Sequence, residues 1–167
     1  MVQIDLEDEG VTLSVEHQLS EEELRLHREK IMRFVTEADR GAFICEDGTG
    51  ARIGLLMYSI VNREGEYLWP TIFRELDRGM LQEDGRFIEI FQLWVHPDHR
   101  RSGIATKLKL QLEEEARIVL VNLIYTHTEE RNLHVLKLNE RLGYREVRRG
   151  PIWDEVVRVS LIKQLSC

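Results

Sequence analysis

The stretch LWVHPDHRRSGIAT, residues 93–106, joins an apolar run to a segment with helical composition. The run before it, from Phe87 to Val95, is rich in β-branched and aromatic residues, which is typical of a central strand buried on both faces. Pro97 has no N–H group to donate to a neighbouring strand, so the strand is expected to end there. A helix is expected from Gly103 to about Val119. The sequence therefore predicts a strand, a tight turn and a helix.

The turn of this unit has the properties of an anion site. The N–H groups in the first turn of a helix lack partners, and the helix dipole adds partial positive charge there. Gly103 and Ala105 are small enough for a ligand to approach the backbone, and Arg100 and Arg101 supply positive charge. Such a turn suits a pyrophosphate. From the spacing alone, a plain connection with two surface arginines is an equally good interpretation.

Further strands and helices are expected on both sides of this unit. Ser20 and Glu23 have capping-box spacing, and Gly41 is placed to end the helix that they begin. The other expected strands are residues 11–16, 42–46, 52–62, 121–126, 144–149 and 156–165, and the other expected helices are residues 70–79 and 132–142. This order predicts an α/β (α+β) fold in one domain over residues 1–167. Its mixed sheet has both parallel and antiparallel strands, with helices on its faces.

Composition restricts the class of protein. The chain has 167 residues, of which 43% are hydrophobic and 32% charged, as in a folded globular domain. Its net charge of -7 disfavours nucleic acid and anionic membranes as partners and weakly favours a cationic one, although solubility alone explains it. Two cysteines give no disulfide framework or metal cluster, and no signal peptide or membrane-length apolar run is seen. We expect a cytoplasmic protein, as a monomer or a homodimer.

Two motifs carry a resemblance to a known family. The first is Leu93-x-Val95-x-Pro97 followed by Arg100-x-x-Gly103-x-Ala105, and the second runs from Asn132 through Leu138-Asn139 to Gly143-Tyr144. Over residues 87–145 the sequence resembles the GNAT superfamily of N-acetyltransferases. The resemblance implies a twisted mixed sheet of about six to seven strands flanked by about four helices. It also implies an acyl-CoA-dependent transfer of acetyl to a primary amine.

The resemblance implies a site for acetyl-CoA as co-substrate. The pyrophosphate would be wrapped by the loop that comprises Arg100, Arg101, Ser102, Gly103, Ile104, Ala105 and Thr106. The strand at Leu93 and Val95 would pair with the pantetheine arm, and Asn132 would contact that arm. A bulge near Leu93 would splay the next strand away and aim a backbone N–H at the thioester oxygen. No metal and no covalent acyl-enzyme are implied.

Glu89 is the candidate base, because it is an ionisable group inside an apolar strand. Burial would raise the pKa of its carboxyl and suit it to accept a proton from the amine. Its distance before Arg100 matches the base glutamate of the histone-type members of the family. The alternative is a carboxylate that faces a wet cleft without a chemical role.

Asn139 departs from the family pattern, in which many members have a tyrosine that protonates the departing thiolate. An asparagine amide can hydrogen-bond the sulfur but cannot supply the proton. The thiolate could leave unassisted, Tyr125 or another tyrosine could replace the acid, or the chain could bind CoA and catalyse poorly. The last case would make it a CoA-binding sensor or regulatory module. A protein-interaction domain whose arginines meet a phosphate is a further alternative.

The acceptor is expected to be a small-molecule or peptide amine. In the family it is bound by the first helix and the segment that here spans residues 63–86. That segment holds acidic and aromatic residues that could attract a cationic amine, or it could be a solvated lid. His96 and His99 are expected to be loop residues, since no third metal ligand lies near them, and His127 could line the cleft.

Overall fold

The computed structural model describes residues 20–65 and 78–166, in which six strands form one mixed sheet ordered β1-β2-β3-β4-β6-β5. The elements along the chain are α2 (Glu21–Thr36), β1 (Arg40–Glu46), β2 (Arg52–Asn62), a 3-10 turn (Arg78–Met80), β3 (Arg86–Val95), a second 3-10 turn (Pro97–His99), α3 (Ile104–Ile118), β4 (Leu123–Glu129), α4 (Leu133–Arg141), β5 (Arg145–Gly150) and β6 (Arg158–Gln164). The mixed α/β fold class is confirmed. The strand expected at residues 11–16 and most of the helix expected at 70–79 lie outside the described residues.

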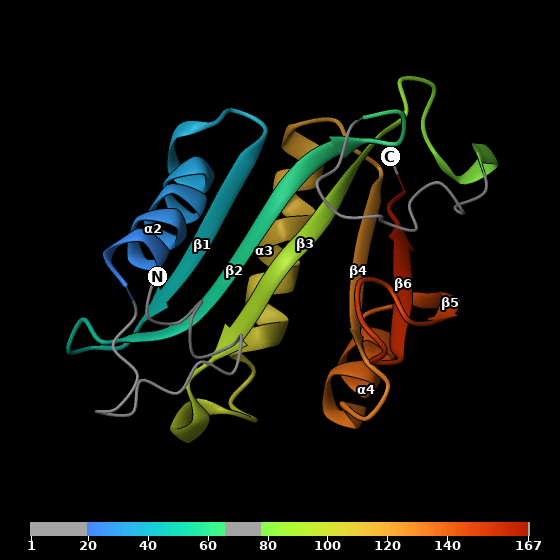
Figure 1. Ribbon diagram of the computed structural model, residues 1–167. Coiled ribbons are helices and arrows are strands. Elements are labelled where there is room, and N and C mark those ends of the chain that lie inside the picture. Colours follow the sequence, from blue (N-terminus) through green and yellow to red (C-terminus); the bar gives the residue numbers. More distant parts are fainter. Residues whose placement is uncertain (1–19, 66–77, 167) are drawn as a thin grey trace.

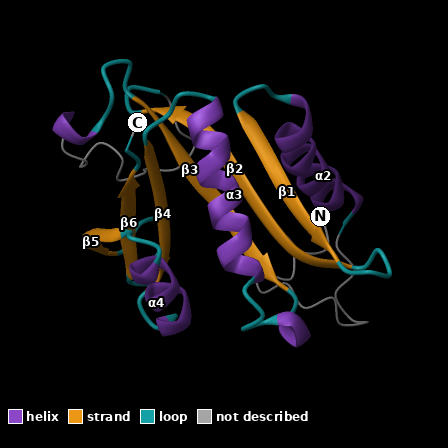
Figure 2. Ribbon diagram, turned by 180° about the vertical axis from the view of Figure 1, so that it is seen from behind, coloured by secondary structure: helices purple, strands orange, loops and turns teal. Residues whose placement is uncertain are grey.

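Helices α2 and α3 cover opposite faces of the sheet (Figures 1 and 2). On one face, Ile31 and Phe34 of α2 pack against Leu55 and Met57 of β2. On the other face, α3 packs its apolar stripe against β2, β3 and β4 in the largest buried cluster. Strand β3 is therefore covered by α3 on one face, whereas α2 covers the other face only in part, because Phe91 there is 40% exposed; burial on both faces, which the apolar run predicts, is only partly found.

The start of α2 is as predicted, and its end is not. The Ser20 hydroxyl accepts a hydrogen bond from the Glu23 N–H (3.2 Å), and the Glu23 carboxylate accepts one from the Ser20 N–H (2.8 Å). The helix ends at Thr36, because Glu37 already has an extended backbone. Gly41 belongs to β1 instead, and it lies under the ring of Tyr58, where a Cβ would come within 2.5 Å of the hydroxyl. Close packing, not helix termination, explains this glycine.

The two central parallel strands pair over a short length and then separate. Strands β3 and β4 are paired only at Ile88 with Ile124 and at Glu89 with Tyr125. The pairing of β3 with β2 shifts register at Phe91, a bulge slightly before the position near Leu93 where the resemblance implied one. Beyond Glu89, β3 bends towards β2 and diverges from β4 (Figure 1). Beyond Glu89, this edge of β3 has no strand partner within residues 20–65 and 78–166.

Candidate active site

The turn after β3 is held in one conformation by bonds within the turn and to β2. The His96 N–H donates to the Ile53 carbonyl (3.0 Å), and the His96 imidazole Nδ1 accepts from the Asp98 N–H (3.3 Å). Arg100 Nε donates back to the Val95 carbonyl (3.3 Å), and the Ser102 hydroxyl donates to the His99 carbonyl. His96 and His99 are therefore structural residues of the turn. No group of three potential metal ligands occurs among the residues that the structure describes.

The N-terminal end of α3 is open at the backbone. Gly103 (φ 86°) and Arg101 (φ 64°) both have left-handed backbone conformations, and Gly103 provides no side-chain cap. The first hydrogen bond of the helix runs from the Lys107 N–H to the Gly103 carbonyl (3.0 Å), so the N–H groups of residues 104–106 point out of the helix end. Apart from its neighbours in the chain, no described residue comes within 4 Å of a Cβ built on Gly103. The arrangement can bind an anion against main-chain amides.

The backbone of β3 has polar groups directed towards the side from which β4 has separated. In an antiparallel ladder, alternate residues bond the partner strand. The His96 N–H bonds β2, so the N–H and carbonyl groups of Leu93 and Val95 point away from β2. The Val95 carbonyl is indeed reached by Arg100 from that side. The Leu93 N–H has the orientation needed to bond a ligand lying along β3.

Helix α4 brings a buried, unpartnered amide to the same end of the sheet. Asn139 is 0% exposed, and neither its amide nitrogen nor its oxygen has a hydrogen-bond partner in the described part of the chain. Leaving such a group unbonded costs about 1–3 kcal/mol, and a ligand would recover that energy only after a shift of the side chains that cover the amide. Asn132 caps α4, where its side-chain oxygen accepts from the Val135 N–H (3.4 Å). Its amide nitrogen remains the group with which it could contact a ligand.

Glu89 lies where β3 and β4 separate, in register with Tyr125. Its side chain points to the α2 face, as does that of Phe87 two residues earlier. Burial raises the pKa of the Glu89 carboxyl to about 8, and the positive charge of Arg40 partly offsets this effect. A carboxyl group with that pKa can exchange a proton near neutral pH.

Tyr125 and Tyr144 are both poor candidates for an acid that protonates the departing thiolate. Tyr125 is 1% exposed, and its hydroxyl bonds the Ser160 hydroxyl (3.0 Å). The Tyr144 hydroxyl is buried without a partner among the described residues, and burial raises the pKa of this phenol. When a buried phenol gives its proton to a thiolate, a phenolate is left in an apolar site. The free-energy cost of this transfer is greater when the pKa of the phenol is raised.

A buried lysine beside Tyr144 was missed by the sequence reasoning. Lys109 is 1% exposed, and its Nζ lies 4.3 Å from the centre of the Tyr144 ring. Burial lowers the pKa of Lys109 to about 7. Nearby, Lys163 pairs with the buried Glu113 at 2.6 Å. The available signal was the spacing of Lys109 and Glu113, which are four residues apart on the apolar stripe of α3.

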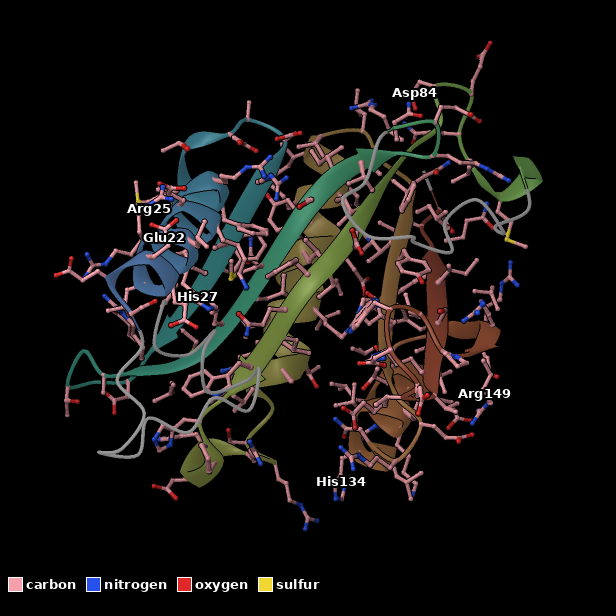
Figure 3. The ribbon with its side chains drawn as sticks, in the orientation of Figure 1. Glu22, Arg25, His27, Asp84, His134 and Arg149 are labelled. Atoms are coloured by element: carbon pink, nitrogen blue, oxygen red, sulfur yellow. The ribbon has the colours of Figure 1, made fainter. Side chains whose placement is uncertain are left out.

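The acidic segment from Arg63 to Arg86 is described only in part. Glu83 and Asp84 line an open cavity of about 750 Å³ together with the C-terminal end of α3. Asp84 is bonded to Arg86 and Gln82. It lies at the end of the sheet opposite α4, where His134 is labelled (Figure 3). The described acidic residues therefore lie far from the turn, and Glu66, Trp69, Glu75 and Asp77 are outside the described residues. No described helix is long and apolar enough to span a membrane.

Comparisons with known proteins agree with this fold. The structure is similar to Arabidopsis thaliana NAA60 in complex with a bisubstrate analogue, with a TM-score of 0.67, 20% identity, and coverage of 85% of this chain and 90% of that one. It is similar to the ribosomal-protein-alanine N-acetyltransferase of Brucella melitensis, with a TM-score of 0.68, 18% identity, and coverage of 98% and 91%. A third similar structure is the NatC complex bound to Gag peptide and CoA, with a TM-score of 0.65, 19% identity, and coverage of 99% and 89%.

No curated protein matches the sequence itself. These solved structures share the fold at low identity. A family model, described as the Acetyltransferase (GNAT) family, matches residues 6–144 and so includes both motifs and the separated strands. The enzyme class expected from the motifs, an N-acetyltransferase, is confirmed, and the chain belongs to the Acetyltransferase (GNAT) family.

Proposed function

We propose that this protein transfers the acetyl group of acetyl-CoA to a primary amine by direct attack. One observation carries the proposal: the unpaired edge of β3 at Leu93 and Val95 leads directly to the open amides at the start of α3. Similar structures contain acetyl-CoA, CoA or a bisubstrate analogue, which supports the same ligand here.

The residues of the turn and of the adjoining strand fit this ligand. The N–H groups of Ile104, Ala105 and Thr106 would hold the pyrophosphate, with Arg101 and the free guanidinium nitrogens of Arg100 adding charge. Ser102 and Gly103 shape the turn. Leu93 and Val95 would bond the amide groups of the pantetheine arm as an added strand does. Asn132 and the buried Asn139 would supply further hydrogen bonds along the arm.

The bound co-substrate supplies an acetyl group activated as a thioester. Glu89 would take the proton of the attacking amine, directly or through one water, as the nitrogen–carbon bond forms and the carbon–sulfur bond breaks. The Leu93 N–H would bond the oxygen on which negative charge develops. The sulfur leaves as a thiolate, which the Asn139 amide can hydrogen-bond and which then takes a proton from water. This arrangement needs no metal and no acyl-enzyme.

The acceptor is proposed to be the amine of a peptide or a small molecule. Similar structures include a ribosomal-protein-alanine N-acetyltransferase and a complex with a peptide, which supports a peptide N-terminus among the candidates.

Two measurements test the function. Calorimetric titration with acetyl-CoA should show binding that weakens about tenfold in Arg101→Ala, while Arg28→Ala, an exposed arginine of α2, should bind as the wild type does. Thiol release should then depend on an added amine. Absence of acetyl-CoA binding would refute the proposal, and binding without amine-dependent thiol release would point to a sensor instead.

Asn139→Tyr examines the missing acid. If thiolate departure limits the rate, this substitution should increase turnover. An unchanged rate would indicate that the thiolate leaves without a protein acid.

A further inference from the structure

The opening between β3 and β4 has aromatic side chains on both sides at the α2 face. Beyond the paired residues Glu89 and Tyr125, the next side chains on that face are Phe91 on β3 and His127 on β4. Phe91 contacts Phe34 of α2, with ring centres 4.9 Å apart. The ring of His127 lies 6.2 Å from that of Tyr125. Glu89 therefore lies where the two strands are still paired. Aromatic rings flank the opening beyond it, where the strands have separated.

The loop between β5 and β6 extends the His127 side of the opening. The Trp153 ring meets the His127 ring edge-on, with centres 5.0 Å apart. Trp153 is 44% exposed and Phe91 is 40% exposed, although both are large apolar side chains. One accessible aromatic ring, that of Phe91, thus lies two residues beyond Glu89 on β3, and the other, that of Trp153, adjoins the opening through its contact with His127. Exposed apolar surface of this kind, next to a polar group, is typical of a binding site.

Cations lie beside both rings, but the one beside Trp153 is paired with a carboxylate. Arg158 lies 4.1 Å from the centre of the Trp153 ring and also bonds both oxygens of the Asp154 carboxylate, and Lys30 lies 5.4 Å from the centre of the Phe91 ring. Burial lowers the pKa of His127 to about 4, with a further contribution from the charge of Arg158, so this imidazole is neutral at physiological pH. The His127 side of the opening is therefore uncharged. Placing a second positive charge of the acceptor between these rings would cost desolvation free energy, because the Asp154 carboxylate is already paired with Arg158.

We propose that the acceptor carries an apolar side chain on the carbon next to the reacting amine, and that Trp153 and Phe91 hold this side chain while Glu89 faces the nitrogen. This inference rests on the proposed acetyl transfer and specifies its acceptor. It differs from the expectation that the acidic and aromatic residues of 63–86 attract a cationic amine, because the described residues around Glu89 provide aromatic rings. The acceptor is thus a primary amine next to an uncharged, apolar side chain, such as the N-terminus of a peptide that begins with a large apolar residue.

Amino-acid amides test the proposal, because they share one reacting group and differ only in the side chain. With wild-type protein, kcat/KM for leucinamide should exceed that for glycinamide by about tenfold or more, since several methylene groups enter an apolar site. Lysinamide and spermidine should be the poorest acceptors. Trp153→Ala should lower kcat/KM for leucinamide about tenfold through KM and leave glycinamide within about twofold. Trp153→Phe should restore most of the preference.

Control measurements separate the two levels of inference. Ile118→Ala removes a side chain that is 72% exposed on α3, and this variant should have the wild-type kcat/KM for every acceptor. A wild type that prefers spermidine or lysinamide, or a Trp153→Ala protein that slows all acceptors equally, would overturn the proposal while leaving acetyl transfer intact. Acetyl-CoA binding without acetylation of any of these amides would also overturn it. Absence of acetyl-CoA binding would instead refute the proposed function.

Discussion

Replacing Lys109 by methionine should stabilise the protein at neutral pH. The substitution keeps the length of the side chain and removes an ammonium group that is 1% exposed and has no hydrogen-bond partner in the described part of the chain. Lys163 is already paired with Glu113, so the substitution does not break that ion pair. The contact of Lys109 with the Tyr144 ring at 4.3 Å is the favourable interaction that is lost.

The size of the effect follows from the pKa of Lys109. Burial lowers it from 10.5 to about 7, while the charge of Glu113 raises it and that of Lys163 lowers it. Each tenfold change in a protonation constant corresponds to about 1.4 kcal/mol, so burying the amine costs about 4–5 kcal/mol at pH 7. Losing the cation–π contact destabilises the variant by about 1–2 kcal/mol, which offsets part of this gain. We therefore expect Lys109→Met to raise the free energy of unfolding by about 3 kcal/mol at pH 7.

The gain should depend on pH in a defined direction. Between pH 7 and 10.5 the folded wild type binds fewer protons at Lys109 than the unfolded chain does, so its stability rises with pH. The difference between the variant and the wild type should therefore shrink as pH rises and largely vanish near 10. Urea unfolding at several pH values measures this, with Lys107→Met, an exposed lysine of the same helix, as a control that should change little. A Lys109→Met protein that is less stable at pH 7 would show that the ammonium group is stabilised by its surroundings.

Three further changes test other parts of the structure. Glu89→Gln should lower kcat/KM by about a hundredfold and remove the increase with pH that the wild type should show up to about 8; an unchanged pH–rate profile would rule out Glu89 as the base. Gly54→Ala places a Cβ 2.6 Å from Cγ2 of Ile104 and should cost about 1–3 kcal/mol in chemical denaturation, a value near zero being evidence that α3 can shift. Ser20→Ala removes the capping-box hydroxyl and should cost about 1 kcal/mol, whereas Ser20→Asp should retain most of the stability.

Local sequence predicted the elements whose signals lie within a few residues. Pro97 ends β3 and Gly103 precedes α3, as the stretch around them predicts. The cap of α2 and the hairpin from β1 to β2 are also as predicted. Each of these features depends on a side chain or backbone group acting on a neighbour in the chain, so the information is complete in a short segment.

Other features depend on residues that are distant in sequence. Gly41 was expected to end a helix, but it is needed where the ring of Tyr58 crosses β1. Likewise, Val35 is an apolar residue of α2 next to the buried Phe34, yet it is 65% exposed. The approach of Trp153 to His127 depends on a loop that returns over β4. No periodicity in the sequence encodes these contacts.

The sequence by itself thus determined the strand, turn and helix around Pro97, the two family motifs and the candidate base Glu89. Tertiary structure alone decided that β3 and β4 separate after the pair Glu89–Tyr125, that the amide of Asn139 is buried with no hydrogen-bond partner among the described residues, and that Lys109 lies against the ring of Tyr144. The physical reason is that capping and chain termination are local interactions, whereas strand separation, burial and the resulting pKa changes depend on which distant segments pack together.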